Sequence, residues 1–196
     1  MPKIVALNGS PRRQGSTAAL VEEIVKGAVL QGAEADIYDL NGMNIRGCQS
    51  CYTCKSEGRC AVQDDMQELY GQIAAADGLI LGTPVYMWQM SAQLKLAVDR
   101  LLPFLKPGYV SALAPGKKVV LAVTQGREGT AMFRPYFEQV AKNLLFLGFG
   151  ACEILIAGGT RQPADLLKQA EVLAEARRLG EWLAESGPED AADSPE

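Results

Sequence analysis

Hydrophobic residues along the chain follow two alternating patterns, short apolar runs and longer stretches with apolar residues at helical spacing. Residues 3–8 (KIVALN) form an apolar run that stops at Gly9-Ser10-Pro11, which is typical of a buried parallel strand entering a turn. From Ser16 onward, apolar residues recur every three or four positions, which predicts an amphipathic helix capped by Ser16 or Thr17. The predicted strands cover residues 3–8, 33–38, 78–83, 118–124 and 152–157. The predicted helices begin at residue 16 and near residue 64, and then cover 94–105, 132–145 and 163–183.

This alternation of strands and helices predicts an α/β fold. Strand–helix–strand units require right-handed crossovers, so the five strands should form a doubly wound parallel sheet with helices on both faces. The natural strand order is 2-1-3-4-5. We expect residues 1–186 to form one domain and the acidic segment 187–196 (GPEDAADSPE) to be a disordered tail. The connection 103–116 is long for this fold class, which favours a functional role or contact with a partner.

Composition excludes several classes of function. Apolar residues make up 48% of the chain and the net charge is -4, so a nucleic-acid partner is disfavoured. No apolar run is long enough to span a membrane, and Met1 is not followed by a signal-peptide pattern, which predicts a cytoplasmic protein without a membrane partner. The chain has no histidine, which excludes Ser-His and Cys-His nucleophile pairs and histidine-ligated zinc.

The segment 9–17 (GSPRRQGST) has the chemistry of an anion site. It combines the hydroxyls of Ser10, Ser16 and Thr17 with a cation, Arg12 or Arg13, and with backbone amides at a helix N-terminus. These groups suit a phosphate. The alternative is an ordinary Gly/Pro turn with a capping serine. Neither the Walker motif nor the dinucleotide fingerprint is present, which disfavours a nucleoside triphosphate.

A second segment, 83–90 (TPVYMWQM), exposes large flat side chains directly after a buried strand. In a parallel sheet, ligands bind at the carboxyl ends of the strands. Tyr86, Met87, Trp88 and Met90 therefore favour contact with a planar ring, because aromatic and sulfur groups pack on ring faces and edges. An oligomer contact is the alternative, and the two roles can coexist.

Taken together, these motifs resemble a known family. The segments GSPRRQGST, TPVYMW…LKLAVDR and TQG, with a cysteine loop ending in DDM, are similar to the flavodoxin-like NAD(P)H-dependent FMN reductases over residues 3–160, most closely their iron-sulfur flavoprotein branch. The resemblance implies a flavodoxin-like fold and an FMN-dependent oxidoreductase that uses NAD(P)H as co-substrate. It implies no catalytic side chain, because the flavin itself accepts the hydride.

The resemblance also implies which residues bind the cofactor. Ser10, Arg12, Ser16 and Thr17 would hold the FMN phosphate, although the family commonly has Asn where this chain has Ser16. The other implied residues flank the isoalloxazine ring or shape the loops, and the complete cofactor-binding set is Ser10, Arg12, Gly15, Ser16, Thr17, Pro84, Val85, Tyr86, Met87, Trp88, Thr124 and Gly126.

Four cysteines lie close together in the loop 47–63. Cys48, Cys51, Cys54 and Cys60 have the spacing C-x2-C-x2-C-x5-C, which lets one loop surround a [4Fe-4S] cluster and resembles the iron-sulfur flavoprotein pattern. Zinc bound by four thiolates and unligated thiols remain the alternatives. Cys152, alone in a predicted strand, is most simply a small buried hydrophobic residue.

Several functions remain compatible with these residues. The electron acceptor is expected to be a small molecule or a redox protein. The alternatives are a cluster-free NAD(P)H:quinone or flavin reductase, a non-catalytic carrier of the flavodoxin type, and a metal-bound interaction module. The aromatic loop and the long connection favour a homo-dimer or homo-tetramer. Asp99 and Arg100 are charged candidates for a site, but their place near the end of a helical stripe favours structural ion pairing.

Overall fold

A computed structural model describes residues 1–185 and has a parallel sheet at its centre. Five parallel strands lie in the order β2-β1-β3-β7-β8, which confirms the predicted 2-1-3-4-5 arrangement, and a short sixth strand, β4, pairs with β3. The strands of this sheet are β1 (Lys3–Asn8), β2 (Glu34–Asp39), β3 (Gly78–Tyr86), β4 (Gln89–Met90), β7 (Lys118–Thr124) and β8 (Ala151–Ala157).

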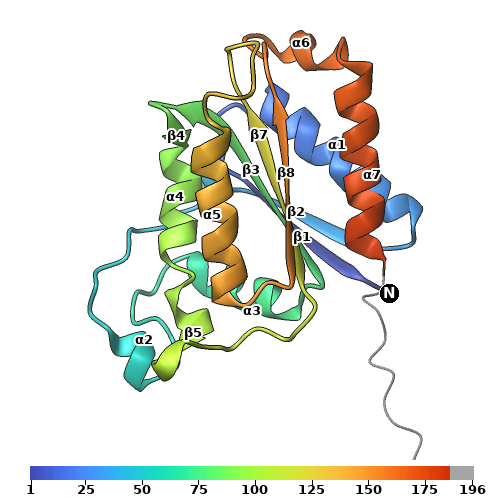
Figure 1. The fold of residues 1–196 in the computed structure, drawn as a ribbon. Helices are drawn as coiled ribbons and strands as arrows, with labels where there is room; N and C mark the ends of the chain where they lie inside the picture. The colour runs from blue at the N-terminus through green and yellow to red at the C-terminus, as the bar shows by residue number, and fades with distance from the viewer. Residues whose placement is uncertain (186–196) are drawn as a thin grey trace, which may run out of the picture.

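Helices cover both faces of the sheet. Figure 1 shows α1 and α7 on one face and α4 and α5 on the other. The helices are α1 (Ser16–Leu30), α2 (Thr53–Ser56), α3 (Met66–Ala75), α4 (Ala92–Asp99), α5 (Arg134–Leu147), α6 (Pro163–Leu167) and α7 (Ala170–Ala184). A 3-10 turn, η1 (Leu40–Gly42), follows β2.

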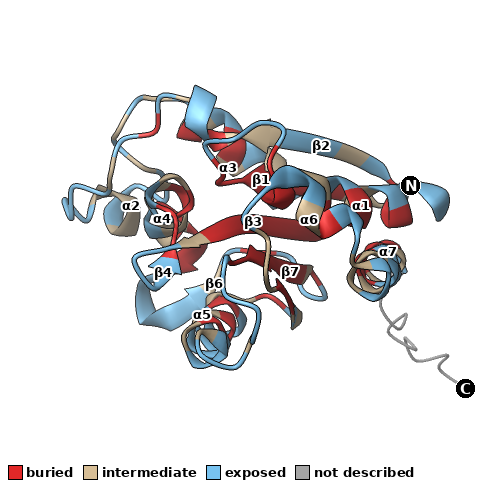
Figure 2. Ribbon diagram, turned by 90° about the horizontal axis from the view of Figure 1, so that it is seen from above, coloured by how far each residue is buried: buried red, intermediate tan, exposed pale blue. Residues whose placement is uncertain are grey.

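Alternate residues of each central strand enter different cores. Val5 and Leu7 of β1 pack with α3, α4 and α5, whereas Ile4 and Ala6 pack with α1 and α7. All four are fully buried, and burial of each large aliphatic side chain contributes about 1.5–3 kcal/mol. In Figure 2 the central strand β3 is buried except at its carboxyl end, whereas the edge strand β2 is largely not buried. The continuous apolar runs of the sequence are therefore explained by burial on both faces.

Two glycines allow α1 and α7 to approach closely. A Cβ atom at Gly27 would collide with the backbone of Arg177, and one at Gly180 would collide with the backbone of Ile24. The same contact carries an ion pair, in which Arg177 donates to the buried carboxylate of Glu23 at 3.1 Å. The helices α1 and α7 together cover the face of the sheet opposite to the one that α4 covers.

The predicted helix over 94–105 is wrong in its second half. The helix α4 ends at Asp99, and the chain continues through η2 (Leu102–Phe104), β5 (Leu105–Lys106), η3 (Pro107–Tyr109) and β6 (Val110–Ser111). Pro103 explains the ending, because proline cannot donate a helical hydrogen bond and disfavours helical geometry in the preceding residue. The predicted loop 103–116 thus contains a small hairpin, formed by β5 and β6.

The predicted helix over 163–183 is two helices. A turn at Lys168 and Gln169 separates α6 from α7. The side-chain amide of Gln169 donates to the carbonyl of Gly158 at 2.8 Å, which ties the turn to the end of β8.

The predicted tail 187–196 lies outside the described residues, and the single domain over 1–186 stays a prediction. Across residues 1–185, no helix is both long enough and apolar enough to cross a membrane.

Candidate functional site

Three loops meet where β1, β3 and β7 end. Two hydrogen bonds join them. The hydroxyl of Ser91, after the β3–β4 hairpin, donates to the carbonyl of Gly9 at 2.7 Å. The hydroxyls of Thr17 and Thr124 lie 2.6 Å apart in a buried contact between the first and third loops. The structure therefore brings the three predicted cofactor segments together at one edge of the sheet, as the parallel strand order requires.

The first loop approaches its neighbours closely and leaves a helix end uncapped. A Cβ atom at Gly9 would lie 2.7 Å from the Cβ of Leu94, so only glycine fits there. The residue before α1 is Gly15, in an extended conformation, and no side chain caps the helix. The predicted cap by Ser16 or Thr17 is therefore wrong. An uncapped helix N-terminus offers unpaired N–H groups and a positive partial charge to an anion.

The hydroxyls of this loop differ in their partners. Ser10 accepts from the amide of Arg12 at 3.1 Å. Ser16 donates to the carbonyl of Gln162 at 3.0 Å, and Thr17 pairs with Thr124. All three hydroxyl residues are buried to more than nine-tenths. Ser16 and Thr17 thereby connect the loop to the rest of the protein, and the role of all three hydroxyls at a phosphate stays a prediction.

The two arginines of this loop are not equivalent. The Nε of Arg13 lies 3.7 Å from a carboxylate oxygen of Asp39. Arg12 is exposed and has no ion pair with any residue in 1–185. Arg12 is therefore the free cation of the loop.

The second segment forms a strained hairpin. The predicted strand 78–83 extends to Tyr86 and turns through Met87 and Trp88 into β4. The φ angles of Met87 and Trp88 are 45° and 68°. A two-residue hairpin turn with both φ angles positive normally contains Asn-Gly, and a large residue in this region costs about 1–3 kcal/mol. Met87 is 78% exposed and Trp88 59% exposed, so the strain presents two large apolar side chains to solvent. Such strain is typical of a functional site.

The other residues of this segment differ in exposure. Pro84 is buried, Val85 is half-buried, and Tyr86 is exposed. The hydroxyl of Thr83 accepts from the amide of Ser91 at 2.9 Å, which fixes the base of the hairpin.

The third loop is organised by Gln125, which the sequence analysis did not single out. Its side-chain amide donates to the carbonyls of Arg127 at 3.0 Å and Gly129 at 2.8 Å. Its Oε1 is buried without a hydrogen-bond partner among the described residues. The neighbouring Gly126 is exposed, and its carbonyl accepts from the Nε of Arg161 at 3.1 Å. The TQG motif contains Gln125, but its partners two and four residues away are not visible in the motif.

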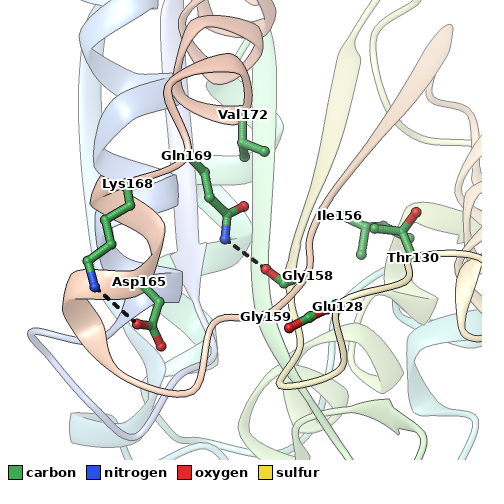
Figure 3. Close-up of a pocket in the computed structure, with 9 residues that line it drawn as sticks. All are labelled: Glu128, Thr130, Ile156, Gly158, Gly159, Asp165, Lys168, Gln169 and Val172. Carbon is green, nitrogen blue, oxygen red and sulfur yellow. Dashed lines mark hydrogen bonds and ion pairs between the residues drawn. The ribbon is translucent and has the colours of Figure 1, made fainter.

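A cavity of about 580 Å³ lies beside the third loop, between Glu128 and Thr130 of that loop and the α6 segment (Figure 3). Asp165 and Lys168 point toward each other, with 3.9 Å between their charged atoms. The amide of Gln169 is held by the carbonyl of Gly158. None of the predicted cofactor-binding residues lines this cavity.

The cysteine loop lies at the other end of α4. Figure 1 shows α2, which carries Cys54, near the carboxyl end of α4, whereas the hairpin adjoins the amino end. Lys55 fixes α2 there by donating to the carbonyls of Leu102, at 3.0 Å, and Leu105. The helix α4, eight residues long, spans about 12 Å between the end that adjoins the hairpin and the end that adjoins α2.

All four predicted ligands line one small cavity of about 20 Å³, and they are Cys48, Cys51, Cys54 and Cys60. Cys48 and Cys51 are exposed, and the other two are half-buried. A hydrogen bond from the hydroxyl of Thr53 lowers the pKa of Cys51, whereas burial raises the pKa of Cys54. In the described part of the chain, no three His, Cys, Asp or Glu side chains are gathered tightly enough to hold a metal ion. The thiols share a cavity but are not a preformed metal site.

Cys152 differs from these four. It lies half-buried in β8, and burial raises its pKa to about 12. A thiol with this pKa stays protonated at neutral pH, which agrees with a packing role.

Asp99 and Arg100 form structural ion pairs, but not with each other. Asp99 pairs with Lys95 at 2.6 Å on the surface of α4. Arg100 pairs with Asp64 at 2.8 Å in a fully buried contact. The interpretation of both residues as structural is confirmed by this geometry, and the partner of Arg100 lies 36 residues away in the sequence.

The fold and the position of the three loops define a class of protein. An open parallel sheet in this order, with three loops meeting at the carboxyl ends of its strands, is the flavodoxin-like arrangement, in which FMN binds at the switch point of the sheet. The chain belongs to the NADPH-dependent FMN reductase family, whose model matches residues 2–157. It is therefore an oxidoreductase of a family that uses FMN and NADPH.

Relatives and solved structures agree with this assignment. An iron-sulfur flavoprotein of Methanocaldococcus jannaschii is 32% identical over 187 residues, which cover 93% of this chain and 96% of that protein. A NAD(P)H:quinone oxidoreductase from Methanothermobacter marburgensis superposes with a TM-score of 0.75 at 23% identity, over 94% of this chain and 97% of the other. An FMN-dependent NADH-azoreductase from Bacillus anthracis, in complex with FMN, has a TM-score of 0.73 at 15% identity, over 93% and 100% of the two chains. These two structures share the fold.

Proposed function

We propose that this protein binds FMN between its three loops, accepts a hydride from NAD(P)H on the flavin, and passes the electrons to a small-molecule or protein acceptor. The observation that carries the proposal is the meeting of an unpaired arginine, an uncapped helix N-terminus and a strained aromatic turn at one edge of the sheet. FMN supplies the hydride-accepting ring when it is bound.

The residues of the first loop would hold the phosphate. Arg12 supplies the positive charge, and the hydroxyl of Ser10 and the amides of Ser16 and Thr17 supply hydrogen-bond donors at the start of α1. A monophosphate fits this short loop better than a pyrophosphate, because the dinucleotide fingerprint is absent.

The other two segments would orient the ring. Residues 84–88 would flank it with the apolar and aromatic side chains of the hairpin. Thr124 and Gly126 would border its other side, and Gln125 would keep their loop in place through its two backbone contacts. No titratable side chain of the chain needs to move a proton in this scheme.

Anaerobic mixing of the FMN-loaded protein with NADH or NADPH tests this proposal. The absorbance of oxidised flavin should disappear with at least one of the two nucleotides, and one nucleotide should be oxidised for each flavin reduced. A protein that binds FMN but oxidises neither nucleotide would instead be a carrier of the flavodoxin type.

We further propose that the four loop cysteines bind a [4Fe-4S] cluster. The four thiols are not gathered closely enough to hold a metal ion as they stand, but two observations support this ligand set: the thiols line a single cavity, and the cavity wall includes the buried Arg100, whose Nε has no partner among the described residues. Four thiolates in one compact loop are the ligand set that this cluster takes. These four cysteines would hold the cluster, and it would supply an electron acceptor near the carboxyl end of α4.

Cysteine variants test the cluster proposal. After anaerobic reconstitution with iron and sulfide, Cys48→Ala and Cys54→Ala should each bind far less iron than the wild-type protein while keeping FMN. Cys152→Ala is the control and should bind as much iron as wild type. If wild-type protein binds no more iron than Cys48→Ala, the thiols are free or zinc-bound, and the enzyme is a cluster-free quinone or flavin reductase.

We also propose that the protein is located in the reducing cytoplasm and that copies of the chain associate with one another there. Clustered thiols without disulfides suit that compartment. The exposed rings of Tyr109 and Phe146 pack against each other at 5.8 Å between centroids, and Met87 and Trp88 add further exposed apolar surface. Such surface favours a homo-dimer or homo-tetramer. Light scattering on the purified protein measures the mass directly, and a monomer mass would contradict this part.

A further inference from the structure

One buried arginine holds both ends of the cysteine loop. Arg100, directly after α4, donates from Nη1 to the carbonyl of Arg46 at 2.7 Å and from Nη2 to the carbonyl of Val62 at 3.3 Å. These two carbonyls lie immediately before and near the end of the loop 47–63. The same guanidinium makes a two-point contact with Asp64, at 2.8 Å and 3.1 Å. Asp64 in turn accepts from the amide of Arg46 at 2.9 Å.

Arg100 and Asp64, with the backbone of Arg46 and Val62, thus form a buried hydrogen-bonded network that joins the two ends of the loop; this network is called the clamp below. The side chains of Arg100 and Asp64 are 1% and 0% exposed. On the other side, the hydroxyl of Tyr70 donates to the backbone carbonyl of Arg100 at 2.8 Å. A guanidinium is always charged, so one positive charge is fixed beneath the loop at every pH at which the protein folds.

One donor of the clamp is unused. The Nε of Arg100 is buried and has no hydrogen-bond partner among the described residues. A buried donor without a partner costs about 1–3 kcal/mol, so most such groups have an acceptor in the functional state. Arg100 lines the same cavity as the four thiols, and Tyr70 interacts by hydrogen bonding with both Arg100 and Cys60.

We propose that Arg100 is a positioning residue for the sulfur centre held by the four cysteines: it closes their loop through Asp64 and donates its free Nε–H to a sulfur of that centre. The inference rests on the proposed cluster. A thiolate-ligated cluster is anionic, and nearby positive charge and hydrogen bonds to its sulfurs stabilise the more negative, reduced form. Arg100 should therefore raise the reduction potential of the cluster as well as hold its loop.

Two substitutions separate these roles, because they alter opposite charges of one clamp. Both Arg100→Gln and Asp64→Asn weaken the closure of the loop. Arg100→Gln removes a positive charge and should lower the potential, whereas Asp64→Asn removes a negative charge and should raise it. A purely structural role predicts no such difference in sign. The potential is read by dye-mediated reductive titration of the iron-loaded protein, together with its iron content.

Matched variants control the comparison. Arg178→Gln removes an arginine that is paired with Glu175 on the surface of α7, and should leave the potential unchanged. Arg100→Lys keeps the charge but loses the planar fork and the Nε–H, and its potential should lie between those of wild type and Arg100→Gln. Should Arg100→Gln fail to fold, as judged by circular dichroism and loss of FMN, the opposite shifts of Arg100→Lys and Asp64→Asn carry the same test.

The failure of each proposal has its own signature. Wild-type protein that takes up no iron overturns the proposed cluster, and this inference with it. Wild-type protein that takes up iron, with arginine and aspartate variants shifted in the same direction or not at all, overturns the inference alone. Arg100 would then be only a clamp for the loop.

Discussion

At the scale of single residues, the first loop contains two neighbouring arginines with different surroundings. Arg12 is exposed and has no ion pair among residues 1–185, whereas Arg13 is beside Asp39. The sequence could not choose between them, because Asp39 is distant in the chain and reaches Arg13 only through the pairing of β1 with β2.

This difference predicts unequal effects on FMN binding. Arg12→Ala should weaken binding by about 1.5–3 kcal/mol, the typical value of a charge-assisted hydrogen bond. Arg13→Ala removes the same charge one residue away and should change binding by less than about 1 kcal/mol, as for an exposed ion pair. Fluorescence titration of FMN with apoprotein measures both affinities. Equal losses in the two variants would remove Arg12 from its proposed role.

Residue types were more predictable than residue partners. Hydroxyls, an arginine and a helix start in 9–17 indicated an anion site from chemistry alone, and the four cysteines indicated a ligand set from spacing alone. The partner of Arg100 and the contacts of Gln125 could not be predicted, since both depend on how distant or irregular segments fold together. The spacing of the cysteines in the sequence also could not predict how far apart their thiols lie in space. Among the described residues, the thiols are not gathered into a preformed metal site.

At the scale of elements, the β3–β4 hairpin is the most unusual part of the candidate site. The apolar runs predicted the central strands β1, β3 and β7, because a strand buried on both faces must be apolar throughout. They did not predict the hairpin, whose turn lacks the Asn or Gly that its positive φ angles favour. Local sequence rules fail here because the strain is held by the surrounding structure, including the bond of Ser91 to Gly9.

The hairpin predicts a fluorescence response to FMN. Trp88 should be quenched when FMN binds, because its side chain is exposed beside the proposed ring site. Trp182 of α7 is the internal control. Its ring lies 5.0 Å from the amino group of Lys118, at the start of β7. The other end of β7, which faces the hairpin, is roughly 20 Å farther along the strand. Quenching should persist in Trp182→Phe and disappear in Trp88→Phe. The reverse result would place the flavin away from the hairpin.

The clamp beneath the cysteine loop predicts a pH-dependent stability. Burial is the largest single influence on the pKa of Asp64, and it raises this pKa. The hydrogen bonds from Arg100 and from the amides of Arg46 and Met66 together outweigh it, so the pKa of Asp64 is lowered. A lowered pKa in the folded state stabilises the protein above the unfolded value of about 3.9, and this stability is lost as the pH falls through the folded pKa.

Asp64→Asn measures this contribution. The variant should lose about 3–5 kcal/mol of unfolding free energy at neutral pH, because it leaves a buried guanidinium without its counter-ion. The difference from wild type should shrink as the pH is lowered below about 4. Urea unfolding at neutral and acidic pH gives both values. A difference that stays constant with pH would show that the carboxylate charge contributes nothing.

At the scale of the whole molecule, α4 connects the proposed flavin site to the cysteine loop. Its amino end begins at Ser91, whose side chain accepts from the amide of Leu94 and donates to the flavin-side loop at Gly9. Its carboxyl end leads directly to Arg100 under the cysteine loop. The predicted 2-1-3-4-5 strand order and the family assignment both agree with a flavin at the amino end of this helix.

The central claim is that the three loops of this chain hold FMN, and the most direct measurement is the identity and amount of the bound flavin. Protein purified under anaerobic conditions, or refolded apoprotein mixed with FMN and FAD together, should release FMN on denaturation at about one molecule per chain, since a short anion loop at a helix start suits one phosphate. Chromatography of the released flavin gives both quantities. Release of FAD, or no uptake of either flavin by the folded protein, would contradict the account.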